Sequence, residues 1–256
     1  MINILLTGAA GKMGRVVAQA AYGSPLYRIA AGIDINSASA DITAFPLFSS
    51  LSEFSGEVDA VIDFSHHTAL EGLLNFAVRE RLPVVVATTG HTESELAAMK
   101  EAARVIPVFY SRNMSIGINL LAELVRKAAA SLPGFDIEIV EKHHNRKLDA
   151  PSGTALMLAE AASGALDYDP CYTYERQSRR QARDPHEIGI HSVRGGTIVG
   201  EHEVIFAGPD EVITLSHSAA SREVFAQGAL RAALFITGKP AALYNMTDLV
   251  NAAEFE

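Results

Sequence analysis

The sequence contains a single cysteine, Cys171, among its 256 residues. One thiol cannot form an internal disulfide or a multi-thiolate zinc site. Basic residues are also few, with 21 Lys and Arg against 30 Asp and Glu, and the net charge is −9. This charge argues against nucleic acid or an anionic membrane as the main partner. Any bound anion therefore needs a local basic site.

Long hydrophobic runs are missing as well. No stretch has enough uninterrupted apolar residues to span a bilayer. The start, MINILLTGAAG, has no basic residues ahead of its short apolar run, unlike a signal peptide. We therefore expect a cytoplasmic protein with no membrane partner, and the 48% hydrophobic content suits a core of one or two domains.

The first half of the chain alternates short β-branched runs with amphipathic segments. The runs predict buried strands, and the segments between them have helical spacing. Strands that alternate with helices predict a parallel sheet covered on both faces. The expected strands are 2–8, 28–34, 58–65, 83–90 and 106–111, and the expected helices are 12–22, 68–82 and 93–105.

The pattern changes after about residue 115. We expect a long helix, an alternating strand, a further helix, an exposed loop and several strands joined by glycine-containing turns. The last helix has the same residue pattern as the helices of the first half and should pack onto that domain. These segments are 116–132, 135–144, 151–162, 170–187, 188–219 and 222–238.

A glycine-rich loop, TGAAGKMGR, follows the first expected strand and opens the first helix. Gly8, Gly11 and Gly14 allow a tight turn and let backbone N–H groups approach a pyrophosphate. Their spacing, G-x-x-G-x-x-G, departs from the usual G-x-G-x-x-G, so a tight turn without a ligand is the alternative. Asp34 ends the second strand, where its carboxylate can accept the ribose hydroxyls. Together these features favour a nicotinamide dinucleotide.

The residues after Asp34 bear on which nicotinamide cofactor binds. Ile35 and Asn36 follow it, and neither supplies a cation for a 2′-phosphate. A carboxylate at this place repels that phosphate, so NADH is favoured. Lys12 and Arg15 lie close in the sequence and leave NADPH possible.

The fifteen residues EKHHNRKLDAPSGTA, 141–155, concentrate the groups suited to chemistry. A wet strand end with incidental histidines is one interpretation. Zinc is another, but no further ligand has metal spacing and Lys147 repels a cation, so we expect no metal. Ser152 lacks the strand–elbow context of a nucleophile.

A third interpretation fits the whole stretch. Pro151 suits a first helical turn, after which Ser152, Gly153 and Thr154 expose N–H groups that attract a carboxylate. Lys147 and His144 add donors, and His143 can exchange a proton near neutral pH. The segment therefore predicts a small substrate with more than one carboxylate and a hydride transfer that needs a proton.

These residues resemble those of the 4-hydroxy-tetrahydrodipicolinate reductase (dihydrodipicolinate reductase) family. The segment EKHHNRKLDAPSGTA carries the resemblance most specifically. Other motifs stand in the family's order over nearly the full length: GAAGKMGR, VVATTG, NMSIGIN, RGGTIVGEHEV and FAQGALRAA.

The resemblance implies an α/β fold, with a Rossmann-type parallel sheet domain and a second α+β domain with a mixed sheet. Residues 1–114 and 223–256 would form the dinucleotide-binding domain, and 115–222 the domain for substrate binding and oligomerisation into a homotetramer. The implied reaction is NAD(P)H reduction of a cyclic dicarboxylate imine with loss of water, in diaminopimelate and lysine biosynthesis.

The resemblance also implies roles for individual residues. His143 would exchange the proton with Lys147 assisting, and His144, Gly153 and Thr154 would hold the substrate's carboxylates. Arg194, Gly195 and Gly196 would help close the substrate pocket. The residues implied in cofactor binding are Gly8, Ala9, Ala10, Gly11, Lys12, Met13, Asp34, Thr88, Thr89, Gly90, Ser111, Arg112, Asn113 and Met114.

Two places depart from the family pattern. His67 stands where the family commonly has proline, and His66 and His67 are interpreted as a solvated loop. Arg112 stands where small residues are usual.

Two other functions remain as alternatives. One is a homoserine or semialdehyde dehydrogenase. A semialdehyde dehydrogenase needs a reactive cysteine, and Cys171 lies in an arginine-rich loop that is an unfavourable site for a nucleophile. The other is an NADH-sensing regulator without turnover, which would not need the groups of 141–155.

Overall fold

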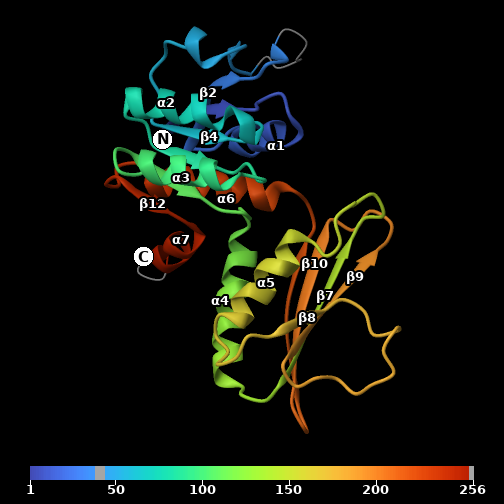
Figure 1. The fold of residues 1–256 in the computed structure, drawn as a ribbon. Coiled ribbons are helices and arrows are strands. Elements are labelled where there is room, and N and C mark those ends of the chain that lie inside the picture. Colours follow the sequence, from blue (N-terminus) through green and yellow to red (C-terminus); the bar gives the residue numbers. More distant parts are fainter. Residues whose placement is uncertain (38–43, 254–256) are drawn as a thin grey trace. The chain divides into compact units, whose positions relative to one another are not determined.

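A computed structural model describes residues 1–37 and 44–253, and the chain divides into two compact units (Figure 1). The first unit comprises residues 1–116 and 222–256, and the second comprises 117–221. The chain therefore leaves the first unit once and returns to it. Within the described ranges, no helix combines the length and apolar character needed to cross a membrane.

The first unit contains a seven-stranded sheet in the order β12-β6-β5-β4-β1-β2-β3. All its neighbouring strands pair in parallel, as the alternation of strands and helices predicts. The strands are β1 (Ile2–Thr7), β2 (Tyr27–Ile33), β3 (Leu47–Phe48), β4 (Ala60–Asp63), β5 (Val84–Val86), β6 (Pro107–Tyr110) and β12 (Ala242–Tyr244).

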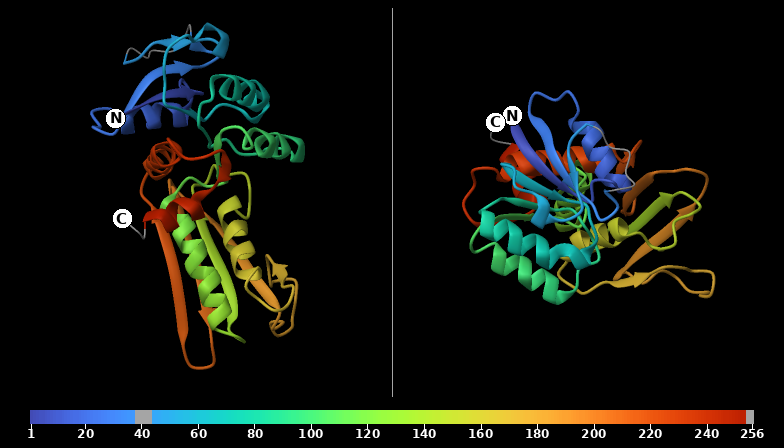
Figure 2. Two further views of the ribbon diagram at one scale, coloured as in Figure 1. Left: turned by 90° about the vertical axis from the view of Figure 1, so that its left-hand side faces the viewer. Right: turned by 90° about the horizontal axis from the view of Figure 1, so that it is seen from above.

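Helices cover both faces of this sheet (Figure 2). On one face α1 (Lys12–Ala21), α6 (Glu223–Ile236) and α7 (Met246–Ala253) contribute to one core. On the other face α2 (Leu70–Glu80) and α3 (Glu93–Ala102) contribute to a second core. A Rossmann-type parallel sheet domain is thereby confirmed.

The second unit contains a five-stranded sheet in the order β11-β10-β7-β9-β8. Strand β10 pairs antiparallel with both neighbours, whereas β7, β9 and β8 pair in parallel, which confirms the mixed sheet. Two helices, α4 and α5, pack on one face of it. The elements are α4 (Ile116–Ser131), β7 (Asp136–His143), α5 (Gly153–Ser163), β8 (Cys171–Thr173), β9 (Glu187–Arg194), β10 (Gly200–Ala207) and β11 (Val212–Ala219).

The expectation that 170–187 is entirely an exposed loop is wrong at three places, one of which is Glu187, a buried residue that begins β9. Cys171–Thr173 form strand β8, which pairs with β9 and is too short to show a period. Arg183 is largely buried because its guanidinium donates to Glu138 (3.0 Å) and to Asp136 (2.8 Å).

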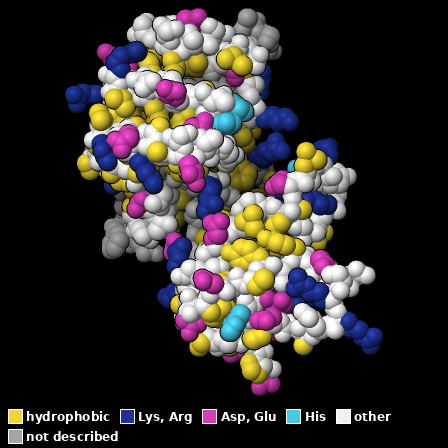
Figure 3. All heavy atoms as spheres, in the orientation of Figure 1, with side chains coloured by type: hydrophobic (Ala, Val, Ile, Leu, Met, Phe, Trp, Pro, Cys, Tyr) yellow, Lys and Arg dark blue, Asp and Glu magenta, His cyan; other side chains and the backbone are white. Residues whose placement is uncertain are grey.

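Basic and acidic side chains are interspersed on the face of the molecule seen in Figure 3, so neither sign of charge forms a broad patch there.

Candidate functional site

The glycine loop of the first unit is too tightly packed to accept side chains. Gly8 has a φ of 70°, and a Cβ there would lie 2.4 Å from the carbonyl oxygen of Phe64, which follows β4. A Cβ on Gly14 would lie 2.2 Å from the carbonyl oxygen of Gly8. The glycines therefore close the loop onto itself and onto the end of β4.

The first turn of α1 suits an anion. Its N-cap, Gly11, offers no capping side chain, and no acidic residue occupies the first turn. The helix dipole and the N–H groups are therefore available to a phosphate. Lys12 is exposed beside them, whereas Ala9 is fully buried and can contribute only backbone atoms.

Asp34 joins the end of β2 to the glycine loop. Its Oδ2 accepts the N–H of Ala10 (2.9 Å), and its Oδ1 accepts the N–H of Asn36 (2.9 Å). A carboxylate has further lone pairs, so these bonds leave capacity for a hydroxyl donor. Asp34 lies in a hollow of about 380 Å³ lined by Thr7, Gly8, Gly11, Ile33, Asp34, Ile35, Asn36, Leu51, Phe64, Ser65, His66, Thr68, Ala69 and Leu73. A hollow of this size beside the glycine loop could hold an adenosine and its ribose.

Asp63 connects three strand ends at this edge, and the sequence analysis missed it. The side chain is almost fully buried and accepts hydroxyl protons from Thr7 (2.5 Å) and Thr88 (2.7 Å). Ser65 also donates to it, through its N–H (3.0 Å) and its hydroxyl (2.5 Å). The available signal was an acidic residue at the end of the short apolar run AVID, 60–63. Thr88 is thus held at the same edge as the glycine loop.

The other residues implied at the nicotinamide end differ in exposure. Thr89 and Gly90 are exposed. The Ser111 hydroxyl donates to the carbonyl of Asn113 (2.7 Å), which forms a tight turn. Met114 is buried in the core, so only its backbone could meet a ligand. Arg112 is exposed; burial raises the pKa of Tyr110, and the nearby Arg112 charge partly opposes that rise.

His66 and His67 have different environments. His66 is exposed, but His67 is only 30% exposed and its Nδ1 lies 2.9 Å from Oε1 of Glu95. Glu95 also forms a capping box with Thr92 at the start of α3. The N–H of Thr92 and then His67 lower the pKa of Glu95 to about 2. His67 therefore links the turn after β4 to the start of α3.

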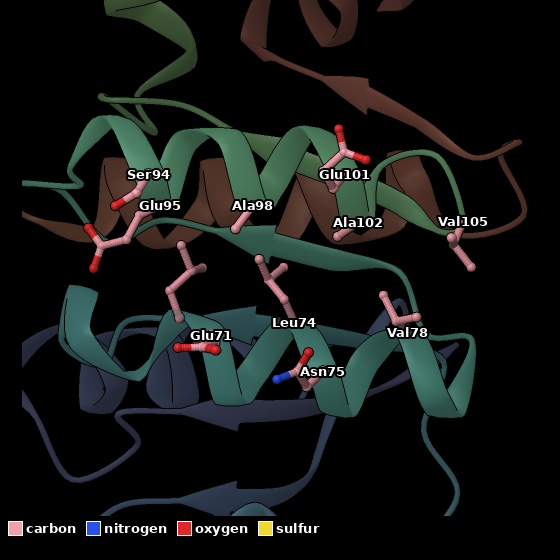
Figure 4. A pocket seen from close by; sticks show the side chains of 11 residues that line it. Glu71, Leu74, Asn75, Val78, Ser94, Glu95, Ala98, Glu101, Ala102 and Val105 are labelled. Atoms are coloured by element: carbon pink, nitrogen blue, oxygen red, sulfur yellow. The ribbon is translucent and has the colours of Figure 1, made fainter.

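A larger hollow of about 650 Å³ lies between α2 and α3 (Figure 4). Its lining is mostly aliphatic, with Glu71, Glu95 and Glu101 as its charged residues. No basic side chain belongs to that lining, so this groove does not suit a pyrophosphate. The smaller hollow beside the glycine loop is therefore the better candidate for binding a dinucleotide.

In the second unit, β7 ends at His143 and brings a buried carboxylate beside it. Ile137, Ile139, Glu141 and His143 alternate along the strand and share one face. Nδ1 of His143 lies 2.6 Å from Oε2 of Glu141. The imidazole is mostly buried, with 12% of its side chain exposed.

Glu141 is 0% exposed, and the sequence analysis missed its role. Arg194 donates to both carboxylate oxygens, from Nη2 to Oε1 (2.6 Å) and from Nη1 to Oε2 (2.8 Å). Burial raises the pKa of Glu141, but the hydrogen bonds from Arg194, His143 and Ser192 outweigh it and bring the pKa to about 2. Glu141 is therefore an anion throughout the physiological pH range.

The start of α5 differs from expectation in two respects. Ser152 is the N-cap and its Oγ accepts the N–H of Ala155 (3.1 Å), so Pro151 precedes the cap and does not lie in the first turn. The N–H of Ser152 is not exposed, because it donates to Oε1 of Glu141 (3.1 Å). Gly153 is exposed, with open space where a Cβ would lie, and Thr154 follows it half-buried. The accessible part of the turn thus begins at Gly153.

The turn between β7 and α5 carries the remaining predicted residues. Nζ of Lys147 pairs with Oδ2 of Asp149 (2.8 Å), and this pairing lowers the pKa of Asp149. The N–H of Lys147 donates to the carbonyl of His144 (3.2 Å). Nδ1 of His144 is buried without a hydrogen-bond partner among the described residues. The N–H of Gly195 donates to the carbonyl of His143 (2.9 Å), which ties the glycine turn to the strand end.

His202, on β10, is a further residue that the sequence analysis missed. Its ring lies edge-on to His143, with 5.2 Å between centroids, and its Nε2 is 3.0 Å from Oγ of Ser152. Burial first, and then the charge of His143, lower the pKa of His202 to about 4. His202 is therefore neutral at physiological pH.

This buried histidine makes folding pH-dependent. The unfolded chain takes up a proton near pH 6.5 that the folded state takes up only near pH 4, so stability falls as pH drops between these values. Lowering the pH from 7.5 to 5 should cost about 2 kcal/mol of unfolding free energy from this group. Urea denaturation should show a smaller loss in His202→Gln. An equal loss in this variant and in His186→Gln, at an exposed loop histidine, would contradict the assignment.

Comparison with known proteins gives the same family for both units. A model of the dihydrodipicolinate reductase N-terminus matches residues 2–114, and one of the dihydrodipicolinate reductase C-terminus matches 117–250. The 4-hydroxy-tetrahydrodipicolinate reductase of Caldanaerobacter subterraneus subsp. tengcongensis is 55% identical over 250 residues, with 98% of each chain covered. The enzyme of the same name from Clostridium novyi is 44% identical over 253 residues, covering 98% of this chain and 99% of that one.

A solved structure is similar over both units as well. The dipicolinate-bound dihydrodipicolinate reductase from Paenisporosarcina sp. TG-14 has a TM-score of 0.80 and 25% identity. The match covers 96% of this chain and 97% of that chain.

Proposed function

Because the chain belongs to the dihydrodipicolinate reductase family and is an NAD(P)H-dependent oxidoreductase, we propose specific roles for the residues of its two units. The activity is reduction of 4-hydroxy-2,3,4,5-tetrahydrodipicolinate to 2,3,4,5-tetrahydrodipicolinate with loss of water, a step of diaminopimelate and lysine biosynthesis. Residues 1–114 and 223–256 bind the dinucleotide, and residues 115–222 bind the substrate.

In the first unit the glycine loop and Asp34 bind the cofactor. The exposed start of α1 holds the pyrophosphate, and Asp34 accepts the ribose hydroxyls beside the hollow that it lines. Thr88, Thr89 and Gly90, with the turn Ser111 to Met114, lie at the nicotinamide end. When bound, the reduced nicotinamide supplies a hydride.

In the second unit the start of α5 and the end of β7 bind and protonate the substrate. Gly153, Thr154 and His144 hold the two carboxylates, with the α5 dipole favouring negative charge. Lys147 adds positive charge and assists as a donor. His143 exchanges the proton that reduction of the imine requires. Arg194, Gly195 and Gly196 border this site, because Gly195 is bonded to the His143 carbonyl.

The observation that carries this proposal is the pairing of His143 with a buried anion beside an accessible helix start. The 2.6 Å bond to Glu141 orients an imidazole for proton exchange, and the same carboxylate accepts the N–H of Ser152, one residue before the open Gly153. A regulator that only sensed NADH would need neither feature.

The direct test is consumption of NADH, followed at 340 nm, with freshly formed cyclic imine. Oxidation should depend on both the imine and the protein, and planar dipicolinate should inhibit it in competition with the imine. NADH binding without oxidation above the rate in buffer would replace this proposal with the sensing function.

We also propose that NADH is the preferred cofactor, with some use of NADPH. The residues lining the hollow beside Asp34 include no Lys or Arg to neutralise a 2′-phosphate. The ratio of kcat/KM should therefore favour NADH. Ile35 is 90% exposed, so Ile35→Arg should add a cation without disturbing the core and should raise kcat/KM for NADPH by about tenfold, close to 1.4 kcal/mol. Ile35→Gln, of similar length without charge, is the control; a large NADPH advantage in the unmodified protein would contradict the preference.

The family resemblance further supports a cytoplasmic homotetramer. Analytical ultracentrifugation of the full chain at micromolar concentration should give one species of four times the 27.3 kDa chain mass.

A further inference from the structure

We propose that Glu141 is a positioning residue that fixes which ring nitrogen of His143 exchanges the proton and anchors the start of α5 to that imidazole. This inference depends on the role proposed for His143 and adds the residues that place it. Glu141, Ser152 and His202 form the buried support, and all three belong to the second unit.

Glu141 occupies a position that the strand pattern would give to an apolar residue. It follows Ile137 and Ile139 on the inward face of β7, and both are buried in the core. A carboxylate without partners there would be strongly unfavourable. The buried charge is instead fully hydrogen-bonded, by two nitrogens of Arg194, by His143, by the N–H of Ser152 and by the Ser192 side chain. A core position of β7 is therefore occupied by a charge, and three of its partners, Arg194, His143 and Ser152, belong to the candidate site.

The charge on Glu141 determines the tautomer of His143. An ionised carboxylate only accepts hydrogen bonds, so Nδ1 of His143 must carry its hydrogen in both charge states of the ring. The proton that comes and goes is therefore on Nε2. Gly200 leaves room there, because a Cβ at that position would lie 3.1 Å from Nε2. Nε2 is thus the atom through which His143 meets the substrate.

Ser152 and His202 extend the same support to α5. The Ser152 hydroxyl accepts the N–H of Ala155 and is also hydrogen-bonded to Nε2 of His202. The N–H of Ser152 is meanwhile bound to Glu141. The N-cap of α5 is therefore held at both its backbone N–H and its side-chain hydroxyl.

One carboxylate consequently sets the distance and direction between the proton-exchanging imidazole and the helix turn that binds the substrate's acids. Small misplacements between a substrate-binding turn and a catalytic group cost rate even when both groups remain present. Glu141 is predicted to act on turnover through His143, with no direct contact to the substrate.

The test is Glu141→Gln in the full chain, with kcat, KM for the cyclic imine and NADH affinity measured over pH 5.5 to 9. The amide can donate to Nδ1 and select the other tautomer, so kcat should fall by about a hundredfold. NADH affinity, measured by fluorescence titration, should stay within twofold. Glu141→Asp, which keeps the charge, should recover part of kcat.

The pH profile separates positioning from a merely structural effect. The charged and titratable groups around His143 are Glu141 on the same strand, Arg194 at the end of β9, His202 on β10 and the Lys147–Asp149 pair in the turn. Removing the negative charge of Glu141, which is bonded directly to the imidazole, disfavours the imidazolium. The alkaline limb of the kcat profile should therefore move to lower pH in Glu141→Gln.

The matched control is Glu203→Gln on β10, where the carboxylate is partly exposed and pairs with Lys142. It should leave kcat and its pH profile unchanged. A double-mutant cycle keeps the test decisive if Glu141→Gln lowers stability: in the His143→Gln background the Glu141 substitution should cost less than threefold in kcat. Equal losses in both backgrounds, or wild-type kcat in Glu141→Gln, would overturn the proposal. Failure of the unmodified protein to oxidise NADH would instead count against the proposed function.

Discussion

Replacing His143 by Gln should lower kcat by about 10² to 10⁴-fold, the usual contribution of a positioned acid or base. The reason is that the amide can still hydrogen-bond to Glu141 but cannot deliver a proton near neutral pH. NADH affinity should stay within about twofold, since the glycine loop and Asp34 belong to the other unit. Steady-state kinetics with the cyclic imine and fluorescence titration of NADH measure the two effects separately.

His186→Gln is the matched control, because His186 is exposed on the loop before β9 and touches none of the site residues described above. It should leave kcat unchanged. Should His143→Gln retain full turnover, or lose NADH binding along with it, the proton exchange would have to be assigned to another group.

The second large effect is expected from Gly8→Ala. A methyl group there would meet the Phe64 carbonyl oxygen at 2.4 Å, in addition to the strain of a side chain at a φ of 70°. Left-handed strain and overpacking together should lower the free energy of unfolding by about 3 kcal/mol or more. The NADH dissociation constant should rise at least about tenfold, since a loop displaced from β4 no longer presents its N–H groups correctly.

Gly23 separates the two causes, because its φ is 73° and open space surrounds the position of its Cβ. Gly23→Ala should therefore show the backbone strain alone, about 1 to 2 kcal/mol, with NADH affinity unchanged. Urea denaturation and NADH titration of the two variants provide the comparison. Equal losses of stability would show that the close approach to Phe64 has no energetic weight.

Long elements of the fold were predictable because burial shows in their residue pattern. The strands of the parallel sheet are continuous apolar runs, and helices such as α2 show an apolar face at helical spacing. The short edge elements β3, β8 and β12 contain two or three residues, too few for any period. Their pairing is decided by neighbouring strands and not by local sequence.

Within the candidate site, the sequence can indicate only those features that combine a residue type with a known spacing. The glycine loop, Asp34 and the stretch around His143 could be recognised in that way. The hydrogen bond from the Ala10 N–H to Asp34 could not be recognised in that way, nor could the partners of Asp63. Both depend on loops that fold over the strand ends. Glu141 did leave a local signal, a charge at an inward position of β7, but its partner Arg194 lies 53 residues away.

The interrupted first unit has a consequence for the order in which the chain can fold. Helix α6 supplies Ala226, Ala229, Leu230 and Ala233, all fully buried in the core that it shares with α1. A ribosome makes β1 to β6 and then the whole of 117–221 before this helix emerges. Until then α1 covers this face of the nascent parallel sheet without α6, so the apolar surface that α6 buries stays exposed to water during translation.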